Sequence, residues 1–473
     1  MTERQKWLAL AFLVLAQFMI VLDVSIMNVA LPSIEHEFGL TVTDLQSIVT
    51  AYTLAFGGFL LLGGRAADLY GRRRVFLFGV IGFAFVSFLI GVADSASLMI
   101  PLRALQGFCA AFMSPAALSI ILTTFREAHE RTRALSLWGA VSAGGATAGI
   151  LLGGFLTQYL SWRWNFFVNV PVGLTVVIAA LRLVPPHAAG EHDKTLDLPG
   201  ALLVTSGLML LVYTLSQAHT WGWASFSTIG LIALCALLLI GFFINETYAK
   251  HPLAPLPFFR IGNVAAADLV QLPVTASLFS MFFFLSLYIQ NIRGFSPLES
   301  GLAFLPATMT VALSAILAPR LLKRIGFKPI MVIAPLLIAS GLFIFAHVPI
   351  DGSYVSDILP GLLIAAVGLG FSFVSVSVAA TSGIPGHESG LASGLLTTAQ
   401  QIGGSLGLAL LSSIAASKSA DMLAGFAPTP PAIAAATIAG FHSAFYVGVL
   451  FALAASLIAL LFVRTRIKST TAS

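Results

Sequence analysis

Apolar stretches of about 20 residues recur along the whole chain, separated by short charged or Pro- and Gly-rich segments. A stretch of this length spans the bilayer as an α-helix, whereas β-barrel spans would be about 10 residues long with alternating polarity. The chain is therefore expected to be an all-α polytopic membrane protein with fourteen spans. They are expected near 7–32, 45–64, 75–94, 97–124, 133–158, 163–184, 197–217, 225–247, 263–290, 299–320, 329–349, 357–383, 390–416 and 439–463.

The charge content excludes most other classes of protein. Charged residues make up 9 % of the 473 residues, against about 25 % in soluble domains. The net charge of +5 is scattered through short loops, so we expect no nucleic-acid partner. Cys109 and Cys235 lie inside apolar runs and predict neither a disulfide nor a metal site. Motifs for nucleotide, zinc or haem binding and for a serine nucleophile are missing from the sequence, so we expect neither an enzyme nor a cofactor.

The basic residues predict the orientation of the spans. Of the 24 Lys and Arg residues, all but Arg103, Arg163, Arg293 and Lys418 fall in the N-tail, the C-tail or alternate loops. The positive-inside rule places that set, and with it both termini, on the cytoplasmic side of the cell membrane. Two internal termini require an even number of spans, which agrees with the hydropathy count.

An internal repeat predicts two halves. The loop GGRAADLYGRRR (63–74) follows the second span and APRLLKRIGFKP (318–329) follows the tenth, and Gly71 aligns with Gly326 at an offset of 255. This alignment sets Asp68 against Lys323 and Arg73 against Lys328. We expect an N-terminal six-helix bundle at 1–186, an inserted helix pair with its loops at 187–250, and a C-terminal six-helix bundle at 251–473.

Two opposite charges are expected at a similar depth in the membrane. Asp23 lies in the first span, in LDVSIMNVALP (22–32), and Arg103 lies in the fourth, in RALQG (103–107). Burial favours a neutral carboxyl group and a nearby arginine favours the carboxylate, so any movement that separates the two lets Asp23 take up a proton. The pair is thus a candidate for proton coupling; the alternative is a static salt bridge that positions two helices.

The loop motif GGRAADLYGRRR is a candidate cytoplasmic gate. Its glycines permit a tight turn, and Asp68 at the end of a helix suits contact with a basic residue or a helix N-terminus. The positive-inside rule alone explains Arg72, Arg73 and Arg74, but it does not explain Asp68.

Glycines recur every fourth residue in GGATAGILLGG (144–154), at Gly145, Gly149 and Gly153. Such a stripe lets helices approach closely, either as fixed packing or as a sliding contact between the halves. A partial echo, SGLLTTAQQIGGSLG (393–407), carries Gln400 and Gln401, which either face a central cavity or bond to a neighbouring helix.

A few further polar residues within spans are candidates for a substrate cavity. Asp268 lies near the inner end of the ninth span, where it either contacts substrate or protons, or caps the helix. Gln17, Asn28 and Tyr52 are weaker candidates of the same kind.

In these segments the chain resembles the major facilitator superfamily, in particular its fourteen-helix drug:proton antiporters of the multidrug-efflux type. The first-helix motif is matched at Asp23, Asn28 and Pro32, and SWRWNFFVNVPVG (161–173) resembles the opening of the sixth helix. The loop motif is matched at Gly64, Asp68, Gly71, Arg72 and Arg73, and the fourth-helix motif at Arg103, Gln106 and Gly107.

The fifth-helix motif of these antiporters is matched in part. Gly145, Gly149, Gly153 and Gly154 stand in the expected places, but Ile150 replaces the usual proline. Ser47 also stands where relatives often have tryptophan.

The resemblance implies proton-driven efflux of small lipophilic, often cationic, compounds by alternating access of two bundles, with Gln106 added to the candidate cavity residues. Protons, a small-molecule substrate and membrane lipid are the implied partners, and a monomer is expected. The alternative is an exporter or uniporter of one dedicated metabolite, antibiotic or lipid, which the Ile150 departure favours.

Overall fold

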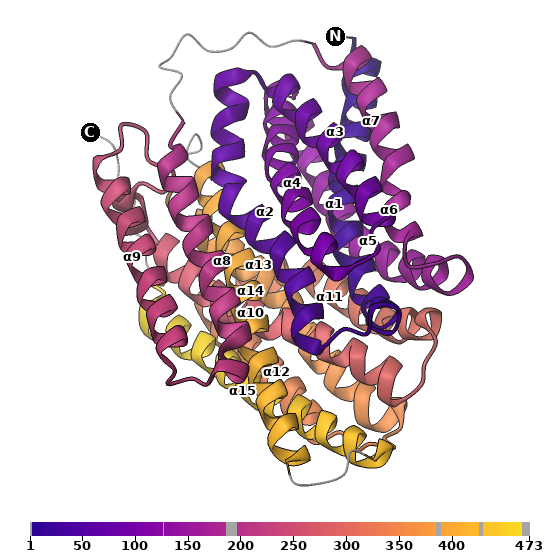
Figure 1. Cartoon of the computed structure of the whole chain (residues 1–473). Coiled ribbons are helices and arrows are strands. Elements are labelled where there is room, and N and C mark those ends of the chain that lie inside the picture. The colour runs from indigo at the N-terminus through magenta and orange to yellow at the C-terminus, as the bar shows by residue number, and fades with distance from the viewer. Residues whose placement is uncertain (1, 126, 186–195, 385–388, 425–428, 466–473) are drawn as a thin grey trace.

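The computed structural model describes residues 2–125, 127–185, 196–384, 389–424 and 429–465. All regular elements in this part of the chain are helices. They form 14 spans that are long and apolar enough to cross a membrane, as expected. One span combines α6 with α7 (Figure 1). Two others combine α10 with the π-turn η2 and the π-turn η3 with α13. The helices are α1 (Glu3–Phe38), α2 (Val42–Tyr70), α3 (Arg72–Gly91), α4 (Ala96–Thr124), α5 (Ala128–Tyr159), α6 (Trp164–Phe167), α7 (Asn169–Leu183), α8 (Leu198–Trp221), α9 (Phe226–Tyr248), η1 (Leu256–Arg260), α10 (Val264–Leu287), η2 (Tyr288–Ile292), α11 (Pro297–Ile325), α12 (Phe327–Phe345), η3 (Tyr354–Ile358), α13 (Leu359–Thr381), α14 (Ser389–Leu423) and α15 (Pro430–Phe462).

The first helix extends beyond the end expected from its sequence. The expected span stops at Pro32, but α1 keeps Pro32 in its interior and continues to Phe38. It ends at Gly39, whose φ of 63° is a left-handed conformation that glycine adopts without steric cost. Proline removes only one helical hydrogen bond, and α1 continues through it.

The two halves repeat one pattern of helix contacts. In the first half α1 contacts α5 and α7, and α3 contacts α4; in the second half α10 contacts α14 and α15, and α12 contacts α13. The corresponding turns between α2 and α3 and between α11 and α12 contain Gly71 and Gly326, with φ of 97° and 77°. Both turns need a positive φ, which is the physical basis of the aligned glycines in the sequence repeat.

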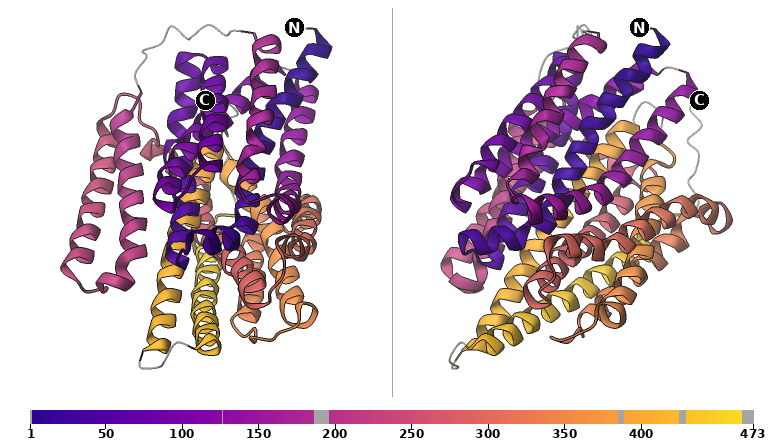
Figure 2. Two further views of the ribbon diagram at one scale, coloured as in Figure 1. Left: turned by 45° about the vertical axis from the view of Figure 1, so that its right-hand side comes forward. Right: turned by 90° about the vertical axis from the view of Figure 1, so that its right-hand side faces the viewer.

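The helix pair α8–α9 stands at one edge of the molecule, where Figure 2 shows it as a separate hairpin. Its inner helix α8 contacts both α2 and α14, so it touches both halves. Ser216 on α8 donates a hydrogen bond of 2.6 Å to Gln46 on α2. The expected boundary between 186 and 187 lies outside the described residues, so the domain limits remain a prediction.

The ends of the helices define two faces of the molecule. We call the face where α1 begins the Glu3 side, and the face where α1 ends the Gly39 side. Hydrogen bonds between the halves join α2 to α14 midway along the helices, where Thr53 and Ser405 share a bond of 2.5 Å. A second group of inter-half bonds lies on the Gly39 side, where Asn291 donates to Glu35 at 2.6 Å.

Candidate functional site

Asp23 and Arg103 form a buried ion pair. Arg103 Nη1 lies 2.6 Å from Asp23 Oδ2, and each side chain is only 1 % exposed. Helix α1 supplies the carboxylate and α4 supplies the guanidinium, so the expectation that the two charges lie at one depth agrees with the geometry. An ion pair in a low-dielectric interior is stable only when further hydrogen bonds satisfy both groups.

Three neutral polar side chains complete this site. Gln106 and Asn169 donate to Asp23 Oδ1 at 2.9 Å and 3.0 Å. Ser87 on α3 accepts a second bond from the Gln106 amide at 2.8 Å. Asp23 therefore accepts hydrogen bonds from three residues, and α1, α3, α4 and α7 are joined through one carboxylate and its immediate partners.

Aromatic rings enclose the guanidinium of Arg103. Its Cζ lies 4.4 Å from the centroid of Tyr52 and 5.8 Å from that of Phe166. Both distances fall within the range of cation–π attraction. Arg103 is thus held between a carboxylate and two ring faces.

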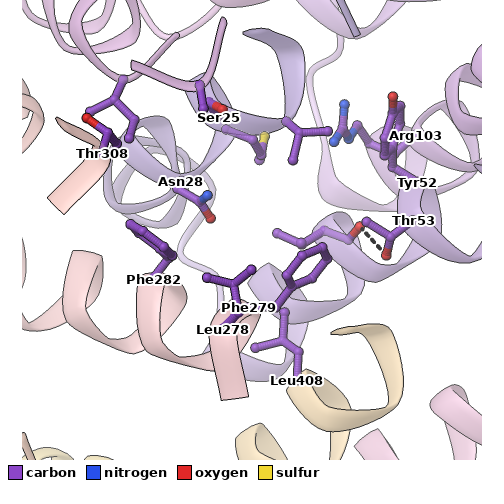
Figure 3. A pocket seen from close by; sticks show the side chains of 15 residues that line it. Ser25, Asn28, Tyr52, Thr53, Arg103, Leu278, Phe279, Phe282, Thr308 and Leu408 are labelled. Atoms are coloured by element: carbon purple, nitrogen blue, oxygen red, sulfur yellow. Dashed lines mark hydrogen bonds between the residues drawn. The ribbon is translucent and has the colours of Figure 1, made fainter. Parts of the chain in front are cut away.

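A cavity of about 180 Å³ lies beside the ion pair, between the two halves. Figure 3 shows Asn28, Tyr52 and Arg103 on one side of it and Phe279 and Phe282 on the other. Most of its wall is aliphatic or aromatic, with a few polar groups, which is typical of sites for small apolar ligands.

The predicted cavity residues fall into two groups. Asn28 and Tyr52 line the cavity, as does Arg103. Gln106 is fully buried in the ion-pair network, and Gln17 accepts a hydrogen bond of 3.0 Å from Ser114 on α4. Neither of them is in the cavity wall.

Two further predicted positions lie away from this cavity. Gln400 and Asp268 are not among the residues that line it. Gln401, the neighbour of Gln400, packs against Gly57 of α2, where an added Cβ would lie 2.7 Å from the Gln401 Cβ. Asp268 is 8 % exposed, and Gln271 on the next turn of α10 is fully buried. Among the residues that the structure describes, neither Asp268 Oδ1 nor the two amide atoms of Gln271 have a hydrogen-bond partner.

The loop motif lies at the Glu3 side within the first half. Asp68 is largely exposed, and its carboxylate is 3.3 Å from Arg72 Nη2. Arg73 donates to the carbonyl of Leu181 near the end of α7 at 2.7 Å. Gly71 forms the turn, and Gly64 faces Pro115 of α4, with 3.7 Å between an added Cβ and the proline Cβ. In this conformation Asp68 and Arg73 therefore bond to residues of their own, N-terminal half.

The glycine stripe of α5 serves two different contacts. Cβ atoms added at Gly145, Gly149 and Gly153 would lie 2.8–3.3 Å from atoms of α1, so these glycines pack α5 against α1 within one half. Gly154 instead faces α11, where an added Cβ would lie 2.7 Å from the carbonyl oxygen of Pro297. The close approach of α5 to α11 in the other half therefore depends on Gly154.

Residue Ile150 lies at this same junction. Its carbonyl oxygen would be 2.8 Å from a Cβ added at Gly301 of α11, and its side chain lines the cavity. The position that departs from the antiporter motif thus contacts both the other half and the cavity.

The family assignment follows from comparison with known proteins. A model described as the Major Facilitator Superfamily matches residues 13–408. The chain belongs to this superfamily.

Characterised members of the superfamily match most of the chain. The puromycin resistance protein Pur8 of Streptomyces alboniger is 39 % identical over 457 residues, which cover 95 % of this chain and 90 % of that protein. The cephamycin export protein CmcT of Amycolatopsis lactamdurans is 37 % identical, covering 86 % and 85 %. The lincomycin resistance protein of Streptomyces lincolnensis is 35 % identical, covering 87 % and 85 %. The expected resemblance to efflux proteins of this superfamily is confirmed.

Solved structures of other facilitators share the fold. A bacterial homologue of the human lysosomal transporter Spinster aligns with a TM-score of 0.70 at 18 % identity, covering 98 % of both chains. A D-xylose–proton symporter aligns with a TM-score of 0.67 at 15 % identity, covering 98 % of this chain and 99 % of that one. As a facilitator, the chain is a multi-pass membrane transporter and not an enzyme.

Sequence reasoning missed two members of the Asp23 site. Asn169 lies in the segment SWRWNFFVNVPVG, and an amide within an apolar span is a signal that it bonds to another buried polar group. Ser87 carries no such signal, because single serines are common in membrane helices and bond to their own backbone. Its hydroxyl does bond to the Phe83 carbonyl, at 2.7 Å, in addition to accepting from Gln106.

Proposed function

We propose that this facilitator exports small lipophilic, often cationic, compounds across the cytoplasmic membrane in exchange for protons. The observation that carries the proposal is the Asp23–Arg103 ion pair, buried beside a cavity to which both halves contribute. A carboxylate at this depth is costly and is a default candidate for function. The relatives named for resistance to or export of antibiotics support the direction of transport.

The proposed cycle alternates the access of the cavity between the two sides. When the halves open outward, Asp23 accepts a proton from the external medium and its attraction to Arg103 is lost. When they open inward, Asp23 releases the proton to the cytoplasm and the cavity takes up substrate. Arg103 sets the proton affinity of Asp23, because it stabilises the carboxylate and not the neutral acid.

The Glu3 side is cytoplasmic in this proposal, which places both termini inside the cell and the basic loops on the cytoplasmic face. Asp68, with Arg72 and Arg73, closes that side when the transporter faces outward. In the structure Asp68 is largely exposed and bonds to Arg72, and Arg73 bonds to Leu181 of the same half. These contacts within one half support a conformation in which the cytoplasmic side is open. The protein acts as a monomer, surrounded by lipid.

Asp268 does not line the cavity beside the ion pair, and we propose it as a separate contact for the positive charge of cationic substrates. Its unbonded oxygen in α10 is available for such a group, and Gln271 adds an unpaired amide one turn further along the same helix.

A second candidate function is the export of one dedicated antibiotic. The relatives named for puromycin, cephamycin and lincomycin favour this alternative, as does Ile150 in place of proline. A panel of structurally unrelated compounds separates the two functions: a multidrug exporter moves many of them, and a dedicated exporter moves only one chemical series.

Transport by purified protein in proteoliposomes with an imposed pH gradient tests proton coupling. We expect gradient-driven accumulation of lipophilic cations by the unmodified protein and its loss in Asp23→Asn, which keeps the shape of the side chain. The variant is expected to retain exchange that needs no gradient. Asp94→Asn, at an exposed acid in the loop between α3 and α4, serves as the matched control. Normal gradient-driven transport by Asp23→Asn would refute the coupling.

A further inference from the structure

Pro32 leaves one backbone carbonyl of α1 without its helical donor. In an α-helix the N–H of each residue donates to the carbonyl four residues earlier, and proline has no N–H. Pro32 lies inside α1, so the carbonyl of Asn28 loses its partner. An unpaired carbonyl inside a membrane protein costs several kcal/mol unless another group bonds to it.

The second half of the molecule supplies the missing donor. Ser286 on α10 donates its hydroxyl to the Asn28 carbonyl at 2.5 Å. Gln290, in the π-turn η2 that follows, donates to the carbonyl of Val29 at 3.1 Å. We call these two bonds the gate hydrogen bonds.

Neighbouring residues hold both donors in place. The Gln290 amide also bonds to Ser300 of α11 at 3.2 Å, and Ser286 and Ser300 are fully buried. The π-turn at Tyr288–Ile292 directs the Gln290 side chain toward α1; such turns are frequent at functional sites. Unlike the α2–α14 contact, the gate hydrogen bonds lie between the cavity and the Gly39 side.

The gate hydrogen bonds adjoin the cavity. The side chain of Asn28 lines the cavity (Figure 3). The carbonyl of the same residue accepts the bond from Ser286. Phe282, one turn before Ser286 on α10, lines the opposite wall. Opening of the Gly39 side therefore requires the separation of two elements that also form the cavity wall.

We propose that Ser286 and Gln290 are positioning residues that hold the Gly39 side closed. Ser286 does so through the Asn28 carbonyl that Pro32 leaves free, and Gln290 does so through the adjacent carbonyl of Val29. The inference rests on the alternating access of the proposed function. It concerns the hydrogen bonds that determine the equilibrium between the closed and the open Gly39 side. It holds whether or not protons drive the cycle.

The test measures closure of the Gly39 side in membranes by cross-linking. Glu35 and Asn291, whose side chains are 2.6 Å apart in the closed gate, are both replaced by cysteine after Cys109 and Cys235 have been changed to alanine. A net hydrogen bond of ordinary strength predicts that Ser286→Ala lowers the ratio of closed to open gate about three- to tenfold. Gln290→Leu is expected to act in the same direction, and Ser286→Thr is expected to restore cross-linking.

The control for Ser286→Ala is Ser280→Ala on the same helix. Ser280 is equally buried, but its recorded hydroxyl bond goes to the Ala276 carbonyl of its own helix, so cross-linking should not change. A further variant, Pro32→Ala, returns a helical donor to the Asn28 carbonyl and should reduce the effect of Ser286→Ala.

Two results would overturn the inference. The first is cross-linking in Ser286→Ala and Gln290→Leu equal to that in Ser280→Ala, with all three inserted and folded. The second is an undiminished effect of Ser286→Ala in the Pro32→Ala background. Neither result bears on proton coupling, which the Asp23→Asn transport assay tests separately.

Discussion

The ring of Tyr52 lies against the guanidinium of Arg103, with 4.4 Å between the ring centroid and the arginine Cζ. The two side chains share the cavity wall, yet each is 1 % exposed or less. The phenol oxygen of Tyr52 has no hydrogen-bond partner within the described part of the chain, whereas its ring face contacts the cation. Because Arg103 also holds Asp23, the ring of Tyr52 acts on the proposed proton site through the arginine.

The effect of a substitution at Tyr52 on gradient-driven transport should therefore depend on whether the new side chain keeps the aromatic ring. We expect Tyr52→Phe to retain gradient-driven transport within about twofold, since the ring remains and the lost hydroxyl bonds to nothing. Tyr52→Leu removes a cation–π contact worth about 2 kcal/mol when desolvated, and should lower transport by about tenfold or more. Initial rates in proteoliposomes measure both variants. Equal activity of the leucine and phenylalanine variants would contradict this role.

Replacing the Arg103 side chain should lower the stability of the protein, and also replacing the Asp23 carboxylate should restore most of that stability. Arg103→Ala leaves a buried carboxylate unpaired, which costs about 3–5 kcal/mol. The double variant Asp23→Asn with Arg103→Ala leaves no unpaired charge, so its thermal midpoint in detergent should recover most of the loss. Gradient-driven transport should be absent in both variants. Strictly additive losses of stability in the double variant would show that the pair is not coupled.

The sequence predicted the fold well because the membrane imposes strong local rules. Apolar length fixes the number of spans, and the alignment of Gly71 with Gly326 reflects a positive φ at two equivalent turns. The Asp23–Arg103 pair was foreseeable for the same reason, since opposite charges at one depth lower each other's cost. Helix α1 continues beyond Pro32, where the expected span ends, and this difference arises because nothing local distinguishes a proline inside a helix from one that ends it.

The cavity was harder to foresee, because it depends on how helices from both halves face one another. Gln106 and Gln17 are polar residues within spans like Asn28, yet they bond within the first half. Likewise, the spacing of the glycines in α5 shows that a helix approaches closely, but it does not say which one. Only the assembled structure separates Gly153, which packs on α1, from its neighbour Gly154, which packs on α11.

Asp268 should discriminate between cationic and neutral substrates. We expect Asp268→Asn to raise the apparent KM for lipophilic cations about tenfold or more, because the amide keeps the shape but loses the charge. Neutral substrates should change by less than about twofold, and Asp268→Glu should keep the preference for cations. Competition assays with paired cationic and neutral compounds measure the ratio. An equal effect on both classes would assign Asp268 a purely structural role.

Gly154 and Gly301 should control closure of the Gly39 side by steric fit alone. A methyl group at Gly154 would lie 2.7 Å from the Pro297 carbonyl oxygen, and one at Gly301 would lie 2.8 Å from that of Ile150, so the backbones must move apart. Gly154→Ala and Gly301→Ala should lower transport and the cross-linking of the Glu35–Asn291 cysteine pair, although alanine favours each helix by about 1 kcal/mol. On α5, the helix that carries Gly154, a Cβ added at Gly144 would meet no described neighbouring atom within 4 Å, so Gly144→Ala should behave like the unmodified protein. Normal cross-linking in the first two variants would show that the helices accommodate the methyl groups and that their close approach does not limit closure.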